Sequence, residues 1–147
     1  MHRFELRVRY GDTDKMGFAY YANYLRWFEI GRAEMLRSMG MSYRSVEQRG
    51  VSLPVLEAWC RYREPARYDD ALAIETGIVS LRRASVRFGY RVLRDGATLA
   101  SGYTEHCFMG REGRPVRPPA ELARILARAP RVPEPLASPA LPGRVLE

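Results

Sequence analysis

One long stripe of apolar residues with helical spacing, between residues 18 and 39, limits most strongly how this chain can fold. The stripe consists of Tyr21, Tyr24, Leu25, Phe28, Gly31, Met35 and Met39, with Asn23, Arg26, Glu34 and Arg37 roughly opposite. At about 1.5 Å per residue, the predicted helix is roughly 30 Å long. Arg32 interrupts the stripe, so it needs a partner if it is buried.

The other periodic segments alternate apolar and polar residues, as β-strands do. Strands are predicted over residues 3–10, 51–63, 71–81, 84–94 and 97–109, with short helices over 42–49 and 120–129. Asp95-Gly96, between the last two strands, is a strong hairpin signal. Five strands that bury one face, and one long helix that covers this face, predict an α+β fold.

Length and composition fit a single domain. The chain has 147 residues, of which 46% are hydrophobic, enough for one core. No apolar run reaches the length of a membrane span, and the first residues lack the apolar region of a signal peptide. Cys60 and Cys107 stand far apart in strand-like runs, which is neither a metal spacing nor a disulfide framework. We therefore expect a cytoplasmic protein without a metal site.

Charge and proline content add two further expectations. The formal net charge of +7 attracts anions, among them nucleic acid, anionic lipid and phosphate-bearing cofactors. The sequence offers no basic helix suited to a nucleic-acid groove and no zinc pattern, so we expect no nucleic-acid partner. Because residues 130–147 are rich in proline and poor in pattern, we expect one domain over 1–129 followed by an extended or disordered tail.

Two aspartates stand directly ahead of the predicted helix, in the stretch YGDTDKMGFAYYANYLRWFE that begins at Tyr10. For Asp12 the Gly-Asp-Thr context predicts an Asx-turn, because a short carboxylate readily accepts hydrogen bonds from nearby backbone N–H groups. For Asp14 the residues alone allow two interpretations. It closes the turn or caps the helix, or it serves as a carboxylate beside a polarised carbonyl group.

Four segments in order resemble one known family. They are RYGDTDKMGFAYYANYLRWFEIGRAEMLR, RYREPARYDDALAIET, RRASVRFGYRV and GRPVRPP, which together span about residues 3–128. The chain resembles the hotdog-fold acyl-CoA thioesterases of the YbgC and 4-hydroxybenzoyl-CoA thioesterase family. This resemblance implies a five-stranded antiparallel sheet wrapped around one long helix. It also implies that two subunits join their sheets edge to edge, with active sites at the subunit interface.

The resemblance also implies catalytic positions. The family's catalytic carboxylate falls on Asp14, which acts either as a general base toward water or as a nucleophile that forms an acyl anhydride. The donor that polarises the thioester carbonyl falls on the backbone N–H of Tyr21, and Gly17 allows close backbone approach. Many YbgC-type members have Tyr-His where this chain has Tyr20-Tyr21, so Asp14 is expected to act without a histidine.

Further residues are candidates for contacts with substrate. Tyr20 belongs to an aromatic cluster that forms core and lines an acyl pocket, and Asn23 either binds substrate or occupies the polar side of the helix. Arg82, Arg83, Ser85, Arg114 and Arg117 match basic segments that lie near the nucleotide end of CoA in related enzymes. Guanidinium groups suit phosphate, although a solvated surface is the alternative for each of them.

The resemblance therefore implies an acyl-CoA thioesterase that needs no metal and no bound cofactor, with CoA entering as part of the substrate. A homodimer or homotetramer is expected. An acyl-ACP thioesterase, or a dehydratase of the same fold, is one alternative. Dehydratases of this fold usually need a histidine facing the acyl chain, and neither histidine here is at the helix start. A non-catalytic acyl-CoA-binding module is another alternative. Aromatic, short-chain and long-chain acyl groups all remain open.

Overall fold

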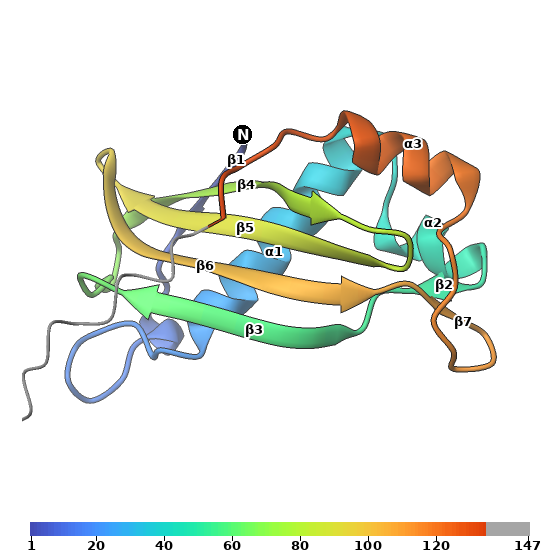
Figure 1. Ribbon diagram of the computed structural model, residues 1–147. Helices are drawn as coiled ribbons and strands as arrows, with labels where there is room; N and C mark the ends of the chain where they lie inside the picture. Colours follow the sequence, from blue (N-terminus) through green and yellow to red (C-terminus); the bar gives the residue numbers. More distant parts are fainter. Residues whose placement is uncertain (135–147) are drawn as a thin grey trace, which may run out of the picture.

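The computed structural model describes residues 1–134 of the chain. Its strands are β1 (His2–Arg7), β2 (Val51–Ser52), β3 (Val55–Tyr62), β4 (Ala71–Leu81), β5 (Ser85–Arg94), β6 (Ala97–Cys107) and β7 (Met109–Gly110). Its helices are the 3₁₀ turn η1 (Tyr10–Asp12), α1 (Asn23–Ser38), α2 (Tyr43–Gln48) and α3 (Ala120–Arg128). A five-stranded antiparallel sheet has the order β1-β4-β5-β6-β3, and β2 pairs with β7 separately. The predicted α+β arrangement of five strands and one long helix is confirmed (Figure 1).

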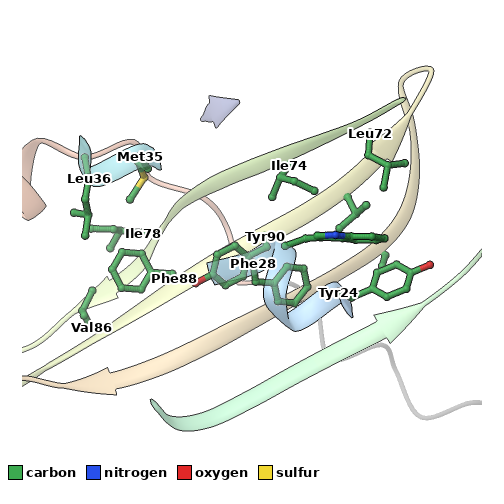
Figure 2. Packing of buried hydrophobic residues seen from close by; sticks show 14 of the residues in the cluster. Tyr24, Phe28, Met35, Leu36, Leu72, Ile74, Ile78, Val86, Phe88 and Tyr90 are labelled. Atoms are coloured by element: carbon green, nitrogen blue, oxygen red, sulfur yellow. The ribbon is translucent and has the colours of Figure 1, made fainter. Parts of the chain in front are cut away.

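The core lies between α1 and one face of this sheet. Figure 2 shows Phe28 of α1 against Tyr90 of β5, with the two rings stacked at a centroid distance of 4.4 Å. Gly31 lies directly on β4, because an added Cβ would be 2.5 Å from Thr76 Oγ1 and 2.7 Å from Ile74 Cγ2. The absence of a side chain at position 31 therefore sets how closely the helix approaches the sheet.

The long helix begins later than its apolar stripe predicts. The expected start was residue 18, but α1 starts at Asn23. Phe18 and Ala19 are extended instead, since Phe18 bridges to Arg67 and the Ala19 N–H donates to the Ala66 carbonyl at 2.8 Å. Backbone groups used in this pairing are not free to form helical hydrogen bonds. Leu25, expected on the buried stripe, is 39% exposed.

Strand boundaries also differ from the prediction in two places. The first strand ends at Arg7 because η1 follows it, and the expected strand 51–63 is divided into β2 and β3 around Pro54. Proline has no N–H to donate to a sheet ladder, which accounts for the break. The last predicted strand likewise divides into β6 and β7, with Phe108 between them.

Arg32 is buried and has polar partners, as the sequence requires. Its guanidinium donates to the hydroxyl of Tyr43, and to Tyr90 Oη at 3.2 Å and Thr104 Oγ1 at 3.3 Å. His106 Nδ1 donates to the Leu53 carbonyl at 2.9 Å, so Nδ1 carries the ring proton. His106 Nε2 is therefore an acceptor, and the Arg32 guanidinium donates to it at 3.2 Å. Within residues 1–134 no carboxylate forms an ion pair with Arg32.

The first residues of the predicted tail contact the sheet. The Ile78 N–H donates to the Pro130 carbonyl at 2.7 Å, and the Val132 N–H donates to the Ile78 carbonyl at 3.0 Å. Glu134 forms an ion pair with Arg87 of β5. Residues 130–132 thus extend along β4 beyond the point where β1 pairs with it. The rest of the predicted tail, 135–147, lies outside the described residues.

Candidate functional site

Asp12 anchors the loop between β1 and α1. Its Oδ2 accepts the Arg9 N–H at 2.8 Å, which closes η1. Its backbone carbonyl accepts two further hydrogen bonds, from the Tyr20 N–H at 2.8 Å and from Asn23 Nδ2 at 2.7 Å. A structural role for Asp12 is therefore supported. The predicted Asx-turn at this residue is wrong, because its carboxylate bonds backward to Arg9 rather than forward.

The Asx-turn of this loop is formed by Asp14 instead. Asp14 Oδ1 accepts the Met16 N–H at 2.9 Å, and the Gly17 N–H donates to the Asp14 carbonyl at 3.0 Å. Oδ2 has no hydrogen-bond donor among residues 1–134. The half-buried side chain of Asp14 is therefore held by one oxygen and presents the other.

Gly17 closes the same turn with a left-handed backbone. Its φ is +80°, a conformation that side-chain-bearing residues seldom adopt. No protein atom of the described chain lies within 4 Å of a Cβ built at this position. The glycine is thus required by the turn itself, and the space in front of it is open to a ligand.

The N-terminus of α1 presents two free backbone donors. The N–H groups of Asn23, Tyr24 and Leu25 donate to the carbonyls three residues earlier, at 2.9, 3.3 and 3.2 Å. The N–H groups of Tyr21 and Ala22 have no acceptor in the part of the chain that the structure describes. Ala22 is the N-cap residue and no side chain caps it. The partial positive charge at this helix end is therefore available to an anion or a polarised carbonyl.

Two exposed tyrosines stand at the end of this loop, directly before α1. The Tyr20 and Tyr21 rings are 4.6 Å apart between centroids. The neighbouring Tyr21 phenol raises the pKa of Tyr20, with a smaller contribution in the same direction from the negative charge of Asp14. Met16 and Tyr21 are 72% and 62% exposed, so the site has an apolar, open surface.

Asn23 has a structural contact of its own. Its side-chain amide donates to the Asp12 carbonyl, so it ties the start of α1 to the loop. Tyr62 of β3 supports the same turn from the sheet, because its hydroxyl donates to the Tyr21 carbonyl at 2.9 Å. Sequence reasoning missed Tyr62. No local spacing places a residue 41 positions away beside this turn, and only the sheet topology brings it there.

The predicted CoA-binding arginines lie at the other end of the molecule. Arg82 and Arg83 form the β4–β5 turn, which the Arg82 N–H closes by donating to the Ser85 carbonyl at 2.8 Å. At about 3.3 Å per residue the 11-residue β4 is roughly 35 Å long, and the Asp14 loop is at its opposite end (Figure 1). Within one chain the structure does not bring these arginines to Asp14.

The same end also holds the other two arginines. Phe108 joins the β4–β5 turn to the segment that contains Arg114 and Arg117. Its N–H donates to the Ala84 carbonyl at 3.0 Å, and its carbonyl accepts the Val116 N–H at 2.7 Å. We call the exposed residues Arg82, Arg83, Arg114 and Arg117 the arginine end. Inside residues 1–134 none of these four forms an ion pair.

Metal and membrane features are absent from the described residues. Residues 1–134 contain no group of three or more His, Cys, Asp or Glu side chains arranged to hold a metal ion. None of the helices described is long and apolar enough to cross a membrane.

The sequence and the fold match known proteins. Residues 8–138 match the family described as the thioesterase-like superfamily. The chain belongs to this superfamily. An acyl-CoA thioester hydrolase, YbgC of Escherichia coli, is 37% identical over 99 residues, which are 67% of this chain and 74% of that protein.

Two solved structures share the fold. A protein from Thermus thermophilus is 34% identical, with a TM-score of 0.83 over 86% of this chain and 98% of that one. A protein from Aquifex aeolicus is 32% identical, with a TM-score of 0.82 over 84% of this chain and 98% of that one. The predicted hotdog thioesterase family is therefore confirmed.

Proposed function

We propose that this protein hydrolyses acyl-CoA thioesters to a free acid and CoA. One observation carries the proposal. A carboxylate with one unengaged oxygen, Asp14, lies in the loop that leads into a helix N-terminus whose Tyr21 and Ala22 N–H groups have no acceptor among the described residues. Thioester hydrolysis needs an attacking oxygen and a polarised carbonyl, and this arrangement supplies both.

The proposed reaction places the thioester carbonyl oxygen at the Tyr21 N–H. The negative charge that develops on this oxygen is stabilised there, at the positive end of α1. Asp14 then acts in one of two ways. As a base, it takes a proton from water while the water oxygen attacks the carbonyl carbon, the C–S bond breaks, and the leaving CoA thiolate takes the proton from Asp14. As a nucleophile, it expels the CoA thiolate directly and forms an acyl anhydride that water opens.

Binding of the CoA part is proposed for the arginine end. Its four guanidinium groups, which form no ion pair within residues 1–134, suit the phosphates of CoA. Since this end is far from Asp14 in one chain, we propose that the phosphates of a bound substrate contact the arginine end of a second subunit. Ser85 lies at the same turn, whereas Tyr20 and Asn23 are proposed to contact the substrate near the carbonyl group.

The edge strand β3 is the proposed site of subunit association. In the part of the chain that the structure describes, β3 pairs with β6 on one side only, so the backbone groups on its other side have no ladder partner there. Val55 and Leu56 on this strand are exposed apolar residues. A second β3 strand would satisfy the backbone groups and cover this surface. We therefore propose a homodimer, or a homotetramer built from it, in a cytoplasmic setting.

A dehydratase reaction has less support from the site. His106 is enclosed by Arg32, Thr104 and Leu53, and burial and the Arg32 charge lower its pKa to about 4. Its ring therefore serves the core and does not face the Asp14 loop.

Thiol release from a panel of aliphatic and aromatic acyl-CoAs tests the proposal. We expect at least one class to be hydrolysed with multiple turnovers, and the preferred class identifies the acyl group. An acyl-ACP included in the panel separates the two carriers. A thermal shift with acyl-CoA, in the absence of any thiol release across the panel, would instead indicate a binding module.

A further inference from the structure

Tyr62, on the edge strand β3, connects the sheet to the turn that begins α1. Its hydroxyl donates to the Tyr21 carbonyl at 2.9 Å. Its ring lies edge-on to the Tyr24 ring at a centroid distance of 4.9 Å, and the Tyr24 hydroxyl in turn accepts the Ala66 N–H at 2.9 Å. Two tyrosine hydroxyls therefore fix the start of the helix to β3 and to the segment that follows it.

The carbonyl that Tyr62 contacts belongs to the same peptide group as the Ala22 N–H. A hydrogen bond to a peptide carbonyl polarises the group and makes its N–H a stronger donor. The preceding peptide group has the same arrangement, because the Tyr20 carbonyl accepts the Asn23 N–H at 2.9 Å. The Tyr21 and Ala22 N–H groups, which lack acceptors within residues 1–134, are thus each backed by a hydrogen-bonded carbonyl.

The two donors lie in overlapping turns that lead into α1. The Asn23 and Tyr24 N–H groups donate to the Tyr20 and Tyr21 carbonyls at 2.9 and 3.3 Å, and Ala22 has helical backbone angles, with φ −68° and ψ −21°. N–H groups in the first turn of a helix point outward along its axis, so consecutive ones address the same space. An oxygen held by two donors there is stabilised more than an oxygen held by one.

We propose that Tyr62 is a positioning residue for thioester hydrolysis, which holds the Ala22 N–H as a second donor beside that of Tyr21. This inference rests on the proposed function and names a further part of the same site. Tyr62 acts through the peptide group that it contacts and does not touch the reacting atoms.

The surroundings of Tyr62 keep its hydroxyl a donor. Partial burial, together with the neighbouring Cys60, raises the pKa of Tyr62, which is 45% exposed, and the phenol retains its proton at neutral pH. Burial also raises the pKa of Cys60 to about 11, so this thiol is protonated at neutral pH.

Tyr62→Phe, compared with Tyr103→Phe, tests this role. The control variant, Tyr103→Phe, also removes one tyrosine hydroxyl. Tyr103 lies on the adjacent strand β6, and its hydroxyl donates to Glu57 instead of to the turn before α1. We expect kcat of Tyr62→Phe to fall about tenfold with KM within about twofold, because the contact strengthens a donor used mainly in the transition state. Tyr103→Phe should keep wild-type kcat, and both variants should melt within a few degrees of the wild type.

A second measurement reports on the contact without activity. The amide proton resonance of Ala22 should move in Tyr62→Phe and stay in place in Tyr103→Phe. An unchanged Ala22 resonance, a kcat within about twofold of wild type, or an equal loss in both variants would overturn the inference. If the wild-type protein hydrolyses no acyl-CoA, the proposed function is overturned, and with it the catalytic part of this role. The Ala22 resonance would still decide whether Tyr62 holds the Tyr21–Ala22 peptide group.

Discussion

His106 illustrates how a single residue in the core responds to its neighbours. Its Nδ1 carries the proton that bonds to the Leu53 carbonyl, which leaves Nε2 as an acceptor for the Arg32 guanidinium. A protonated imidazole would face a buried positive charge at this position. Burial, followed by the Arg32 charge, therefore lowers the pKa of His106 to about 4.

This shift predicts acid sensitivity. His106 is neutral in the folded protein above about pH 4, but it takes up a proton in the unfolded chain below about 6.5. The contribution of His106 to stability is therefore fully present above about pH 6.5 and is lost as the pH drops toward 4, by about 3 kcal/mol. Urea unfolding between pH 7 and 4 measures the change. His106→Gln should flatten the dependence in this range more than His2→Gln does, and equal slopes in both variants would contradict the assignment.

Some residue roles followed from the sequence and others did not. The position of Asp14, just ahead of the helix, was recognisable from the Asp-Thr-Asp stretch and its aromatic surroundings. Which aspartate forms the Asx-turn was not, because it depends on the direction in which each carboxylate finds a backbone N–H. The contact of Tyr62 with this turn was also invisible, since it exists only once β3 and α1 are in place.

At the scale of elements, α1 depends on Gly31 for its approach to β4. An alanine Cβ here would meet Thr76 Oγ1 at 2.5 Å and Ile74 Cγ2 at 2.7 Å. Both side chains are β-branched and lie in a central strand, so neither moves aside easily. Helix propensity favours alanine over glycine by about 1 kcal/mol, but overpacking costs about 1–3 kcal/mol.

Gly31→Ala is therefore expected to destabilise the protein by about 1–2 kcal/mol in spite of its higher helix propensity. Chemical denaturation measures the free energy of unfolding. Glu29→Ala, an exposed position two residues earlier on the same helix, is the control and should stay within about 0.5 kcal/mol of wild type. A stabilised Gly31→Ala would show that the helix and β4 separate without cost.

Periodicity predicted the elements better than it predicted their ends. The 3.6-residue period identified α1, and the two-residue period identified β4, β5 and β6 close to their observed bounds. The start of α1 was placed five residues too early, because Phe18 and Ala19 continue the apolar pattern while their backbones pair with residues 66 and 67. Backbone pairing across the fold is not encoded in the spacing of apolar side chains.

At the scale of the whole molecule, Asp14 and the arginine end lie far apart in one chain. Substitutions at the arginine end should therefore affect substrate binding without affecting the chemical step. Replacing Arg83 or Arg114 with alanine should raise KM for acyl-CoA about threefold to tenfold and leave kcat nearly unchanged, because phosphate contacts anchor the ground state and the transition state equally. The effect should shrink at high salt. Arg3→Ala, which removes an arginine of the edge strand β1, is the control. A normal KM would leave that arginine as ordinary surface charge.

Subunit association is the second prediction at this scale. Light scattering at micromolar concentration should give a dimer or a tetramer. Leu56→Glu, which places a charge on the exposed edge strand β3, should shift the protein toward monomer and reduce turnover with it. Arg3→Glu introduces the same residue on the other edge, β1, and should not change the mass. A fully active wild-type monomer would contradict the shared-site proposal.

The turnover of Asp14→Asn, compared with that of Asp12→Asn, tests the central claim most directly. Both substitutions remove one negative charge from the same loop, and both leave an oxygen to accept the observed backbone N–H, from Met16 and from Arg9 respectively. We predict that kcat of Asp14→Asn on the preferred acyl-CoA falls at least about a hundredfold with KM retained, whereas Asp12→Asn remains close to wild type. Equal, near-normal turnover in the two variants would show that Asp14 only shapes the loop. A loss of turnover in Asp12→Asn alone would assign the chemistry to the Asp12 carboxylate.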